Sequence, residues 1–215
     1  MSAPLRLVGR SSSHFTRVAR MVAAELGLEV ELVVLHDVMN TDVASYGGHP
    51  GMKIPSLLVG EGALFGTDTI CRTLAELAGR DDDPRVVLSH HLRDHLARSA
   101  QEVVWNAMAA QVQLVLRVMV GRLPAEHPYF AKARLGLEQS LCWLDERLDG
   151  VLGRLPPQRQ FSVFEVSLFC LLEHLRFRPT LEWGATPALD GFRGRLASRP
   201  SAQATVFGFD PPARV

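Results

Sequence analysis

The pattern of apolar residues changes near residue 80, and this change constrains the fold more than any other feature of the sequence. Before it, short apolar runs typical of strands alternate with helical spacing, whereas beyond it the apolar residues recur at helical intervals. The charged stretch GRDDDPR (79–85) separates the two parts. We therefore expect an α/β domain over 1–79, a linker over 80–85 and an all-helical domain over 86–215.

The first part predicts a mixed four-stranded sheet. Apolar runs at 5–9 and 30–35 flank a helical pattern, so these two strands should be parallel, and the second should be buried on both faces. After a loop over 36–53, the runs PSLLV and ALF are joined by GEG, which is typical of a β-hairpin. A helix follows, with Thr67 and Asp68 as candidate caps. The predicted order is β-α-β, loop, β-β-α.

The second part predicts a bundle of helices. Long apolar periods run over 86–120 and 129–152. A third helix begins within FSVFEVSLFCLLEHL, where Ser162 and Glu165 have the spacing of a capping box ahead of an apolar run. A fourth helix should extend to Pro200.

Composition restricts the partners. The formal net charge is zero and the sequence pI is about 7.1, so no global field favours nucleic acid or an anionic membrane. No stretch reaches the ~20 apolar residues that span a bilayer, and the start lacks a secretory pattern, so we expect a cytoplasmic protein. Small neutral ligands or protein partners fit this chain better. The three cysteines are odd in number and lie in apolar surroundings, which favours reduced thiols.

Two local patterns are candidates for chemistry, and each has two interpretations. Pro55 is either an ordinary first residue of a strand or the second residue of a cis Ile54–Pro55 bond that exposes the backbone of Ile54. Ser11, Ser12 and Ser13 precede a helix, so they either cap it or present a hydroxyl beside its N-terminus.

A metal site is not expected. His91 and His95 are one helical turn apart in the predicted helix, which suits two ligands, but a third ligand at recognisable spacing is missing.

Several segments together resemble the cytosolic glutathione transferases. The order β-α-β, loop, β-β-α, with KIP before the third strand and GTDTICRTL opening the next helix, is similar to the thioredoxin-like N-terminal domain of that family. The segment FSVFEVSLFCLLEHL resembles the family's capping box and buried helix, and PALDGFRGRLASRPSAQAT resembles its closing segment. The resemblance covers 5–79 and 160–206, whereas 86–150 match only in being helical. It implies a thioredoxin-like domain followed by an all-α helical domain.

The resemblance also implies a site for glutathione as co-substrate at the edge of the first domain. The backbone of Ile54 would pair with the cysteinyl part of the tripeptide, in a geometry set by Pro55. Thr67 would bind the γ-glutamyl carboxylate through its hydroxyl and its backbone N–H, as a helix N-terminus binds anions.

Three further positions follow from the resemblance. This chain has Gly66 where most members have glutamate or glutamine, so one contact to the glutamyl group is missing. Asp68 would replace that contact or reach across a dimer interface. Lys53 lies where a base near the glycine carboxylate makes sense, although a loop lysine is more often simply solvated.

Catalysis in this family requires a thiolate, which a hydroxyl donor beside a helix N-terminus stabilises. The resemblance implies Ser13 as this donor, with Ser12 and Ser11 as alternatives because the register of the loop is open. The pocket for the electrophile would lie between the domains, with Trp105, Met108 and the tail VFGF as candidates, although such apolar residues also suit a core.

The expected function is conjugation of reduced glutathione to a hydrophobic electrophile, as in detoxification, by a homodimer. The alternative is a non-catalytic protein that keeps the fold for protein–protein binding or regulation. Gly66 and the lack of an unambiguous nucleophile favour this alternative.

Overall fold

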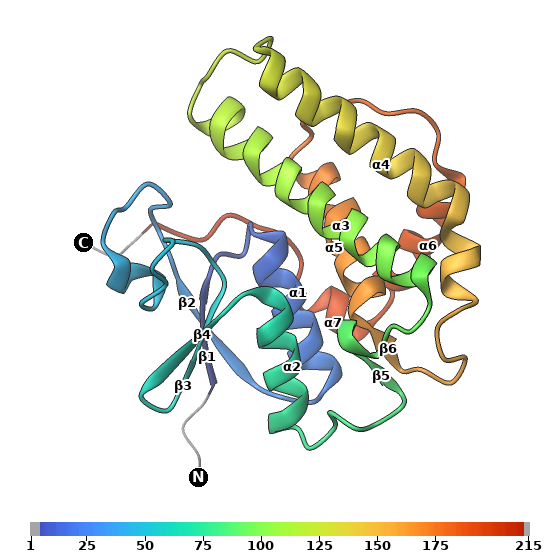
Figure 1. Ribbon diagram of the computed structural model, residues 1–215. Coiled ribbons are helices and arrows are strands. Elements are labelled where there is room, and N and C mark those ends of the chain that lie inside the picture. Colours follow the sequence, from blue (N-terminus) through green and yellow to red (C-terminus); the bar gives the residue numbers. More distant parts are fainter. Residues whose placement is uncertain (1–4, 213–215) are drawn as a thin grey trace.

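A computed structural model describes residues 5–212 of the chain. The N-terminal part contains a four-stranded sheet and two α-helices (Figure 1). Its elements are β1 (Leu5–Gly9), α1 (His14–Glu25), β2 (Val30–Val34), the 3₁₀ turn η1 (Val43–Tyr46), β3 (Ser56–Val59), β4 (Gly62–Phe65) and α2 (Thr67–Leu77).

The sheet has the order β2-β1-β3-β4. β1 and β2 are parallel, whereas β3 is antiparallel to both β1 and β4, which confirms the predicted mixed sheet and hairpin. The prediction that the second strand is buried on both faces is wrong. β2 lies at the edge of the sheet and is only partly buried, because it has a neighbouring strand on one side alone.

Helices α1 and α2 cover the face of the sheet that is turned toward the helical part (Figure 1). The apolar faces of the two helices are fully buried together with Leu7 and Leu57 of the sheet, through Met21 and Val22 of α1 and Ile70 of α2. Burying each of these side chains stabilises the fold by about 1.5–3 kcal/mol. The helical spacing in the sequence therefore fixes which side of the sheet faces the rest of the molecule.

The remainder of the chain is mostly helical, as predicted. Its central helix is α5, which packs on α1, α3 and α6. The elements are β5 (Val86–Val87), η2 (Ser89–His91), α3 (His95–Gln113) with its π-helical continuation η3 (Leu114–Val120), α4 (Pro128–Leu152), β6 (Phe161–Ser162), α5 (Val163–Phe177), α6 (Pro187–Ala197) and α7 (Pro200–Gln203).

The start of this part differs from the prediction of a continuous helix from residue 86. β5 pairs in parallel with β6, and α3 begins only at His95. The helix begins there because the Asp94 carboxylate accepts hydrogen bonds from the amides of Leu96 and Ala97, at 2.9 and 3.2 Å. His91 lies in the preceding 3₁₀ turn, so it does not share a helix with His95.

The segment His95–Val120 is long and apolar enough to cross a membrane by length and composition, although the sequence led us to expect no such stretch. In the fold this segment packs against α4 and α5, and one third of its most apolar window is buried. Its exposed apolar side chains, Leu116, Met119 and Val120, gather at its C-terminal end.

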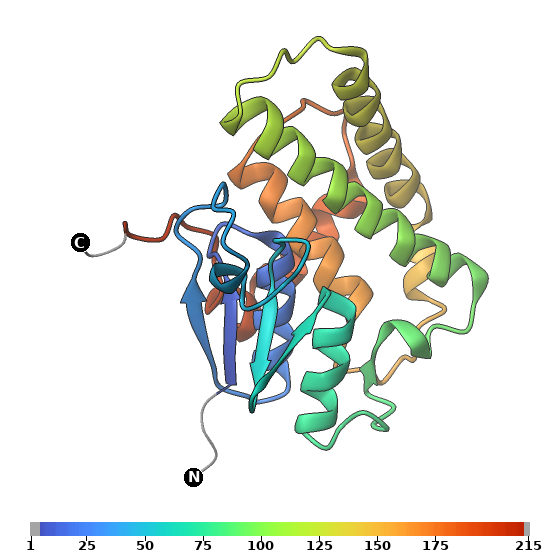
Figure 2. The same cartoon turned by 60° about the vertical axis from the view of Figure 1, so that its left-hand side comes forward.

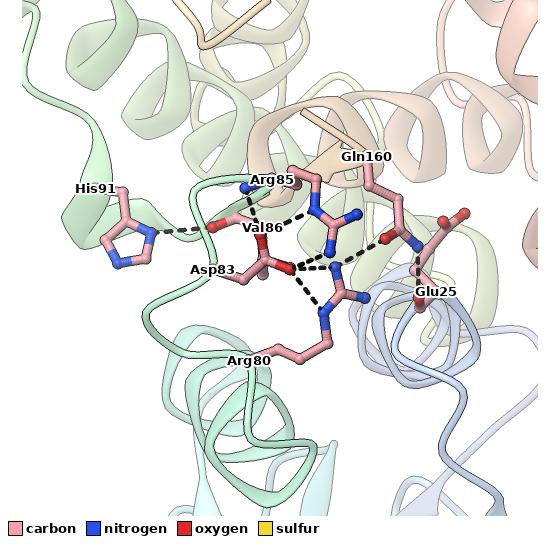
Figure 3. Close-up of polar contacts among 7 residues, drawn as sticks. All are labelled: Glu25, Arg80, Asp83, Arg85, Val86, His91 and Gln160. Atoms are coloured by element: carbon pink, nitrogen blue, oxygen red, sulfur yellow. Dashed lines mark hydrogen bonds and ion pairs between the residues drawn. The ribbon is translucent and has the colours of Figure 1, made fainter. Parts of the chain in front are cut away.

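Charged residues connect the linker to both parts of the molecule (Figure 3). The Asp83 carboxylate accepts hydrogen bonds from Arg80 and Arg85, at 2.7 and 2.9 Å, and these guanidinium groups lower the pKa of Asp83. Arg80 also donates to the side-chain oxygen of Gln160 at 2.9 Å, and the Gln160 amide donates to the Glu25 carbonyl at 2.7 Å. Gln160, in the segment before α5, therefore binds both the linker and the last residue of α1.

Ser162 caps α5. Its hydroxyl oxygen accepts from the Glu165 amide at 3.1 Å, and its O–H donates to the Glu165 carboxylate at 2.7 Å. Arg159 binds the same carboxylate through two hydrogen bonds of 2.8 Å. This buried cap fixes the start of the central helix.

Candidate functional site

Three candidate segments meet at one end of the sheet. Val8 of β1, Ser56 of β3 and Phe65 of β4 lie in one row of the strand register. The loop that contains Ser11, Ser12 and Ser13, here called the serine loop, follows β1. Ile54 precedes β3, and α2 follows β4. All three segments therefore lie at this same end of the sheet. The register therefore brings Ser11–Ser13, Ile54 and the start of α2 to the same end of the sheet.

The backbone at Ile54 is open. The Ile54–Pro55 bond is cis, the second of the two interpretations of the sequence, and Pro55 is buried directly before β3. Within residues 5–212, neither the amide nor the carbonyl of Ile54 forms an intramolecular hydrogen bond. An extended peptide can therefore pair with this residue as an additional strand.

Helix α2 begins without a side-chain cap. Its N-cap is Gly66, so the prediction that Thr67 and Asp68 cap the helix is wrong; both lie in its first turn. The first helical hydrogen bond runs from the Ile70 amide to the Gly66 carbonyl at 3.0 Å. Among the described residues, the amides of Thr67, Asp68 and Thr69 have no hydrogen-bond acceptor. Three free N–H groups and the positive end of the helix dipole make this turn a site for a carboxylate.

The backbone explains why glycine occurs at position 66. Gly66 has φ +86° and ψ 129°, a conformation that other residues rarely adopt. A Cβ atom there would have ample space, because the nearest atom, Thr69 Oγ1, lies 3.8 Å away. The conformation of the main chain, rather than crowding, therefore excludes a side chain.

Ser13 is the N-cap of α1. Its Oγ accepts a hydrogen bond from the Thr16 amide at 3.3 Å, which matches the interpretation of the serines as a helix cap. Within residues 5–212, the Ser13 hydroxyl donates no hydrogen bond. A cap uses the oxygen as an acceptor and leaves the proton, so this role does not prevent Ser13 from donating to a ligand.

The rest of the serine loop is held by distant residues. The Ser11 amide donates to Oδ2 of Asp210 at 3.0 Å, and the Ser12 carbonyl accepts from Nε2 of His174 at 3.2 Å. The Ser13 amide donates to the Arg10 carbonyl at 3.1 Å. Each of the three serines therefore has a backbone contact that restricts the loop.

The C-terminal segment runs from α7 back across the N-terminal domain (Figures 1 and 2). The Arg17 guanidinium of α1 is buried between the rings of Phe169 and Phe207, at 5.0 and 4.4 Å from their centroids. Phe207 also stacks on Phe177 at 5.5 Å. The aromatic tail predicted to line the electrophile pocket thus lies beside the serine loop.

Two histidines are buried behind this loop. The rings of His14 and His174 lie 4.4 Å apart. Burial, and then the proximity of His174, lowers the pKa of His14 well below its usual value. Burial also lowers the pKa of His174 to about 4, although its contact with Ser12 opposes this shift. Both imidazoles are therefore neutral at physiological pH.

The other predicted residues differ in their exposure to solvent. Lys53 and Asp68 are exposed. Trp105 is half-buried and lines an open cavity of about 350 Å³ together with Gln101, whereas the Met108 side chain is fully buried in the core. The structure thus does not bring Trp105 and Met108 together on one exposed surface.

The described residues include no cluster of metal ligands, and two of the three cysteines are buried. Residues 5–212 contain no group of three or more His, Cys, Asp or Glu side chains that could hold a metal ion. Cys71 and Cys170 are buried, and burial raises the pKa of both thiols, in Cys170 to about 12. Such thiols are poor nucleophiles at neutral pH.

Residues 7–82 match the family model of the glutathione S-transferase N-terminal domain. This part of the chain is therefore similar in sequence to the N-terminal domain of that family. Solved structures extend the likeness to the fold of the whole chain. No curated protein matches the chain in sequence.

Three solved glutathione transferases illustrate this shared fold, each aligned over nearly the whole of both chains. A Pseudomonas fluorescens Pf-5 family member with bound glutathione has a TM-score of 0.77 and 24% identity, covering 97% of this chain and 100% of the other. A Methylobacterium radiotolerans transferase in complex with glutathione sulfonate has a TM-score of 0.73 and 24% identity, covering 99% and 100%. A theta-class transferase from Xanthomonas axonopodis pv. citri with glutathione bound has a TM-score of 0.67 and 20% identity, covering 96% and 99%.

Proposed function

We propose that this protein binds reduced glutathione and conjugates it to a hydrophobic electrophile. The observation that carries the proposal is the uncapped first turn of α2, whose three free amides lie at the same end of the sheet as the open backbone of Ile54. A tripeptide with a carboxylate at its γ-glutamyl end matches this combination, because it offers both an extended backbone and an anion. The glutathione bound to the related structures supports this choice of ligand.

In the proposed complex, Ile54 pairs with the cysteinyl unit and Pro55 directs it. The first turn of α2, with the Thr67 hydroxyl, binds the glutamyl carboxylate. Lys53 adjoins Ile54, Asp68 lies in the first turn of α2, and both are exposed. In the proposed complex they would bind the glycine carboxylate and the glutamyl ammonium.

The proposed chemistry is stabilisation of the thiolate by a serine hydroxyl. Ser13 donates its free proton to the glutathione sulfur, with Ser12 and Ser11 as the alternatives, while the N-terminus of α1 adds a favourable dipole. The electrophile would lie against the apolar surface formed by Phe177, Phe207 and Phe209. A homodimer in the cytoplasm with a role in detoxification remains part of the proposal.

A second function is favoured by two observations. Gly66 supplies no side chain for the glutamyl group, and the Ser13 oxygen already caps a helix. A non-catalytic protein that uses the fold for protein binding or regulation would have these features as well.

Two assays separate these functions. An enzyme is retained on immobilised glutathione and conjugates it to a general electrophile. Ser13→Ala should lower this conjugation rate by about 10²-fold and leave retention unchanged, because the hydroxyl acts on the sulfur rather than on binding. Full activity in the Ser13→Ala variant would transfer the role to Ser12 or Ser11, each tested by the same substitution. Absence of both retention and conjugation in the wild type would contradict the enzymatic function.

A further inference from the structure

We propose that His174 of α5 is a positioning residue that orients the serine loop for thiolate stabilisation. The inference rests on the proposed function, and it assigns part of the active-site geometry to a side chain of the helical part. His174 lies 162 positions along the chain from Ser12, whose carbonyl it contacts.

The hydrogen bonds determine the tautomer of His174. The Ser12 carbonyl can only accept, so Nε2 of His174, 3.2 Å away, must carry the proton. Nδ1 is then unprotonated and accepts from the side-chain amide of Gln111 at 3.3 Å. A single neutral tautomer satisfies both contacts.

Gln111 is in turn fixed by two residues of the segment after α5. Its amide nitrogen donates to the Arg178 carbonyl at 2.8 Å, and its amide oxygen accepts from the Thr180 hydroxyl. Gln111 is fully buried, and His174 is 4% exposed. Each side-chain nitrogen and oxygen of His174 and Gln111 has a hydrogen-bond partner, so these contacts hold the imidazole in one orientation.

His174 influences Ser13 through the peptide unit that joins Ser12 to Ser13. The carbonyl of Ser12 accepts from His174, and the amide of Ser13, in the same peptide plane, donates to the Arg10 carbonyl at 3.1 Å. The plane is thus held at both ends. Because it restricts ψ of Ser12 and φ of Ser13, it also restricts the directions of the Cα–Cβ bonds that carry the two hydroxyl groups.

The charged and titratable groups around His174 leave it neutral. The His14 ring lies 4.4 Å from the His174 ring in a tilted arrangement, and the rings of Phe177 and Phe207 also contact His174. Arg178 is the cation that acts on it. The loop therefore receives a neutral N–H donor throughout the pH range in which a glutathione thiol titrates. Substitution of His174 should therefore change the geometry of the serine loop without adding a titrating group to the pH dependence of the thiol.

The test compares two variants of similar size. His174→Phe keeps an aromatic ring and removes the donor, whereas His174→Gln retains an N–H at the Nε2 position and an acceptor for Gln111. The measurement is the pKa of the thiol of bound glutathione, followed by thiolate absorbance against pH. The Phe variant should raise this pKa by about one unit and lower kcat/KM at pH 6.5 about tenfold, as expected for one lost hydrogen bond, with KM for glutathione unchanged within about twofold. The Gln variant should recover most of the loss.

Thr180→Val provides a second variant, because it removes the hydroxyl from Gln111 while His174 stays in place. We expect the pKa of the glutathione thiol to rise in this variant by about half as much as in His174→Phe. If His174→Phe does not fold, Thr180→Val alone tests the inference. Ser140→Ala, whose exposed hydroxyl on α4 contacts only the Gly136 carbonyl, is the matched control and should behave as wild type. A wild-type thiol pKa in both His174→Phe and Thr180→Val overturns the inference alone. Wild-type protein that does not bind glutathione overturns the proposed function, and this inference with it.

Discussion

Asp210 contacts Ser11 at the candidate site, although 199 positions of sequence separate them. The Oδ2 atom of Asp210 accepts from the Ser11 amide at 3.0 Å. Together with the contact of His174 on Ser12, this bond means that the C-terminal segment and α5 both hold the loop that follows β1. The conformation of the serine loop is therefore restricted by residues from the C-terminal part of the chain.

Removal of the hydrogen bond between Asp210 and Ser11 should weaken the attachment of the C-terminal segment. Asp210→Ala leaves the Ser11 amide without its acceptor and should lower the free energy of unfolding by about 1 kcal/mol. Asp210→Asn keeps an acceptor oxygen and should lose about half as much. Urea denaturation measures both changes, and an alanine variant as stable as wild type would mean that the hydrogen bond between Asp210 and Ser11 does not stabilise the fold.

Arg17 should contribute to the attachment of the same segment. It is 2% exposed, lies between two aromatic rings and donates to the Ala202 carbonyl at 3.1 Å. Arg17→Met fills much of the volume but loses these contacts, so we expect a loss of about 2–4 kcal/mol in the free energy of unfolding. Arg17→Lys keeps the charge without the planar group and should recover little of it. Full recovery by lysine would show that charge alone is important.

The buried histidines predict that acid destabilises the protein. In the unfolded chain His174 takes up a proton near its ordinary pKa of about 6.5, whereas in the folded protein the pKa is lowered to about 4. The unfolded state therefore binds more protons between these values, and stability falls as pH falls from about 6.5 toward 4. The pKa of His14 is lowered in the same direction.

Each such histidine contributes a slope of up to about 1.4 kcal/mol per pH unit in this window. Denaturant unfolding at several pH values measures the slope. His174→Gln removes one titrating group and should flatten the curve. An unchanged slope in this variant would mean that folding does not lower the pKa of His174.

Gly66 and Gly62 form a matched pair for testing the start of α2. Gly66→Ala introduces a side chain at φ +86° and should cost about 1–2 kcal/mol, or shift the first turn of α2 and weaken retention on immobilised glutathione. Gly62→Ala is expected to be tolerated, because its Cβ would lie 3.6 Å from the nearest atom, the Val59 carbonyl oxygen. Equal behaviour of the two variants would contradict the role given to the conformation of Gly66.

Much of the fold could be predicted because its signals are local. Helical spacing located α1, α2, α4 and α5, and the GEG turn located the β3–β4 hairpin. The short pairing of β5 with β6 could not be predicted, because two residues give no periodicity and their partner lies far along the chain. The edge position of β2 was also hidden, since apolar composition does not specify how many strands flank it.

The residues of the candidate site also divide into those with a local signal in the sequence and those whose contacts are long-range. Ile54, Thr67 and Ser13 could be proposed from the sequence because the resemblance to the glutathione transferases points to them and each adjoins a strand or a helix end. His174 and Asp210 were missed, because their role depends on long-range contacts. The only signal for His174 was an imidazole within an apolar helix, which just as often indicates a satisfied core residue.

The most direct measurement is a pH titration of the thiol of glutathione bound to the wild-type protein, followed by thiolate absorbance. Our account predicts that glutathione binds and that its thiol titrates at least about one unit below the usual value of about 8.5, because the Ser13 hydroxyl and the N-terminus of α1 favour the anion. A thiol that titrates near 8.5 in the complex, or glutathione that does not bind, would contradict it.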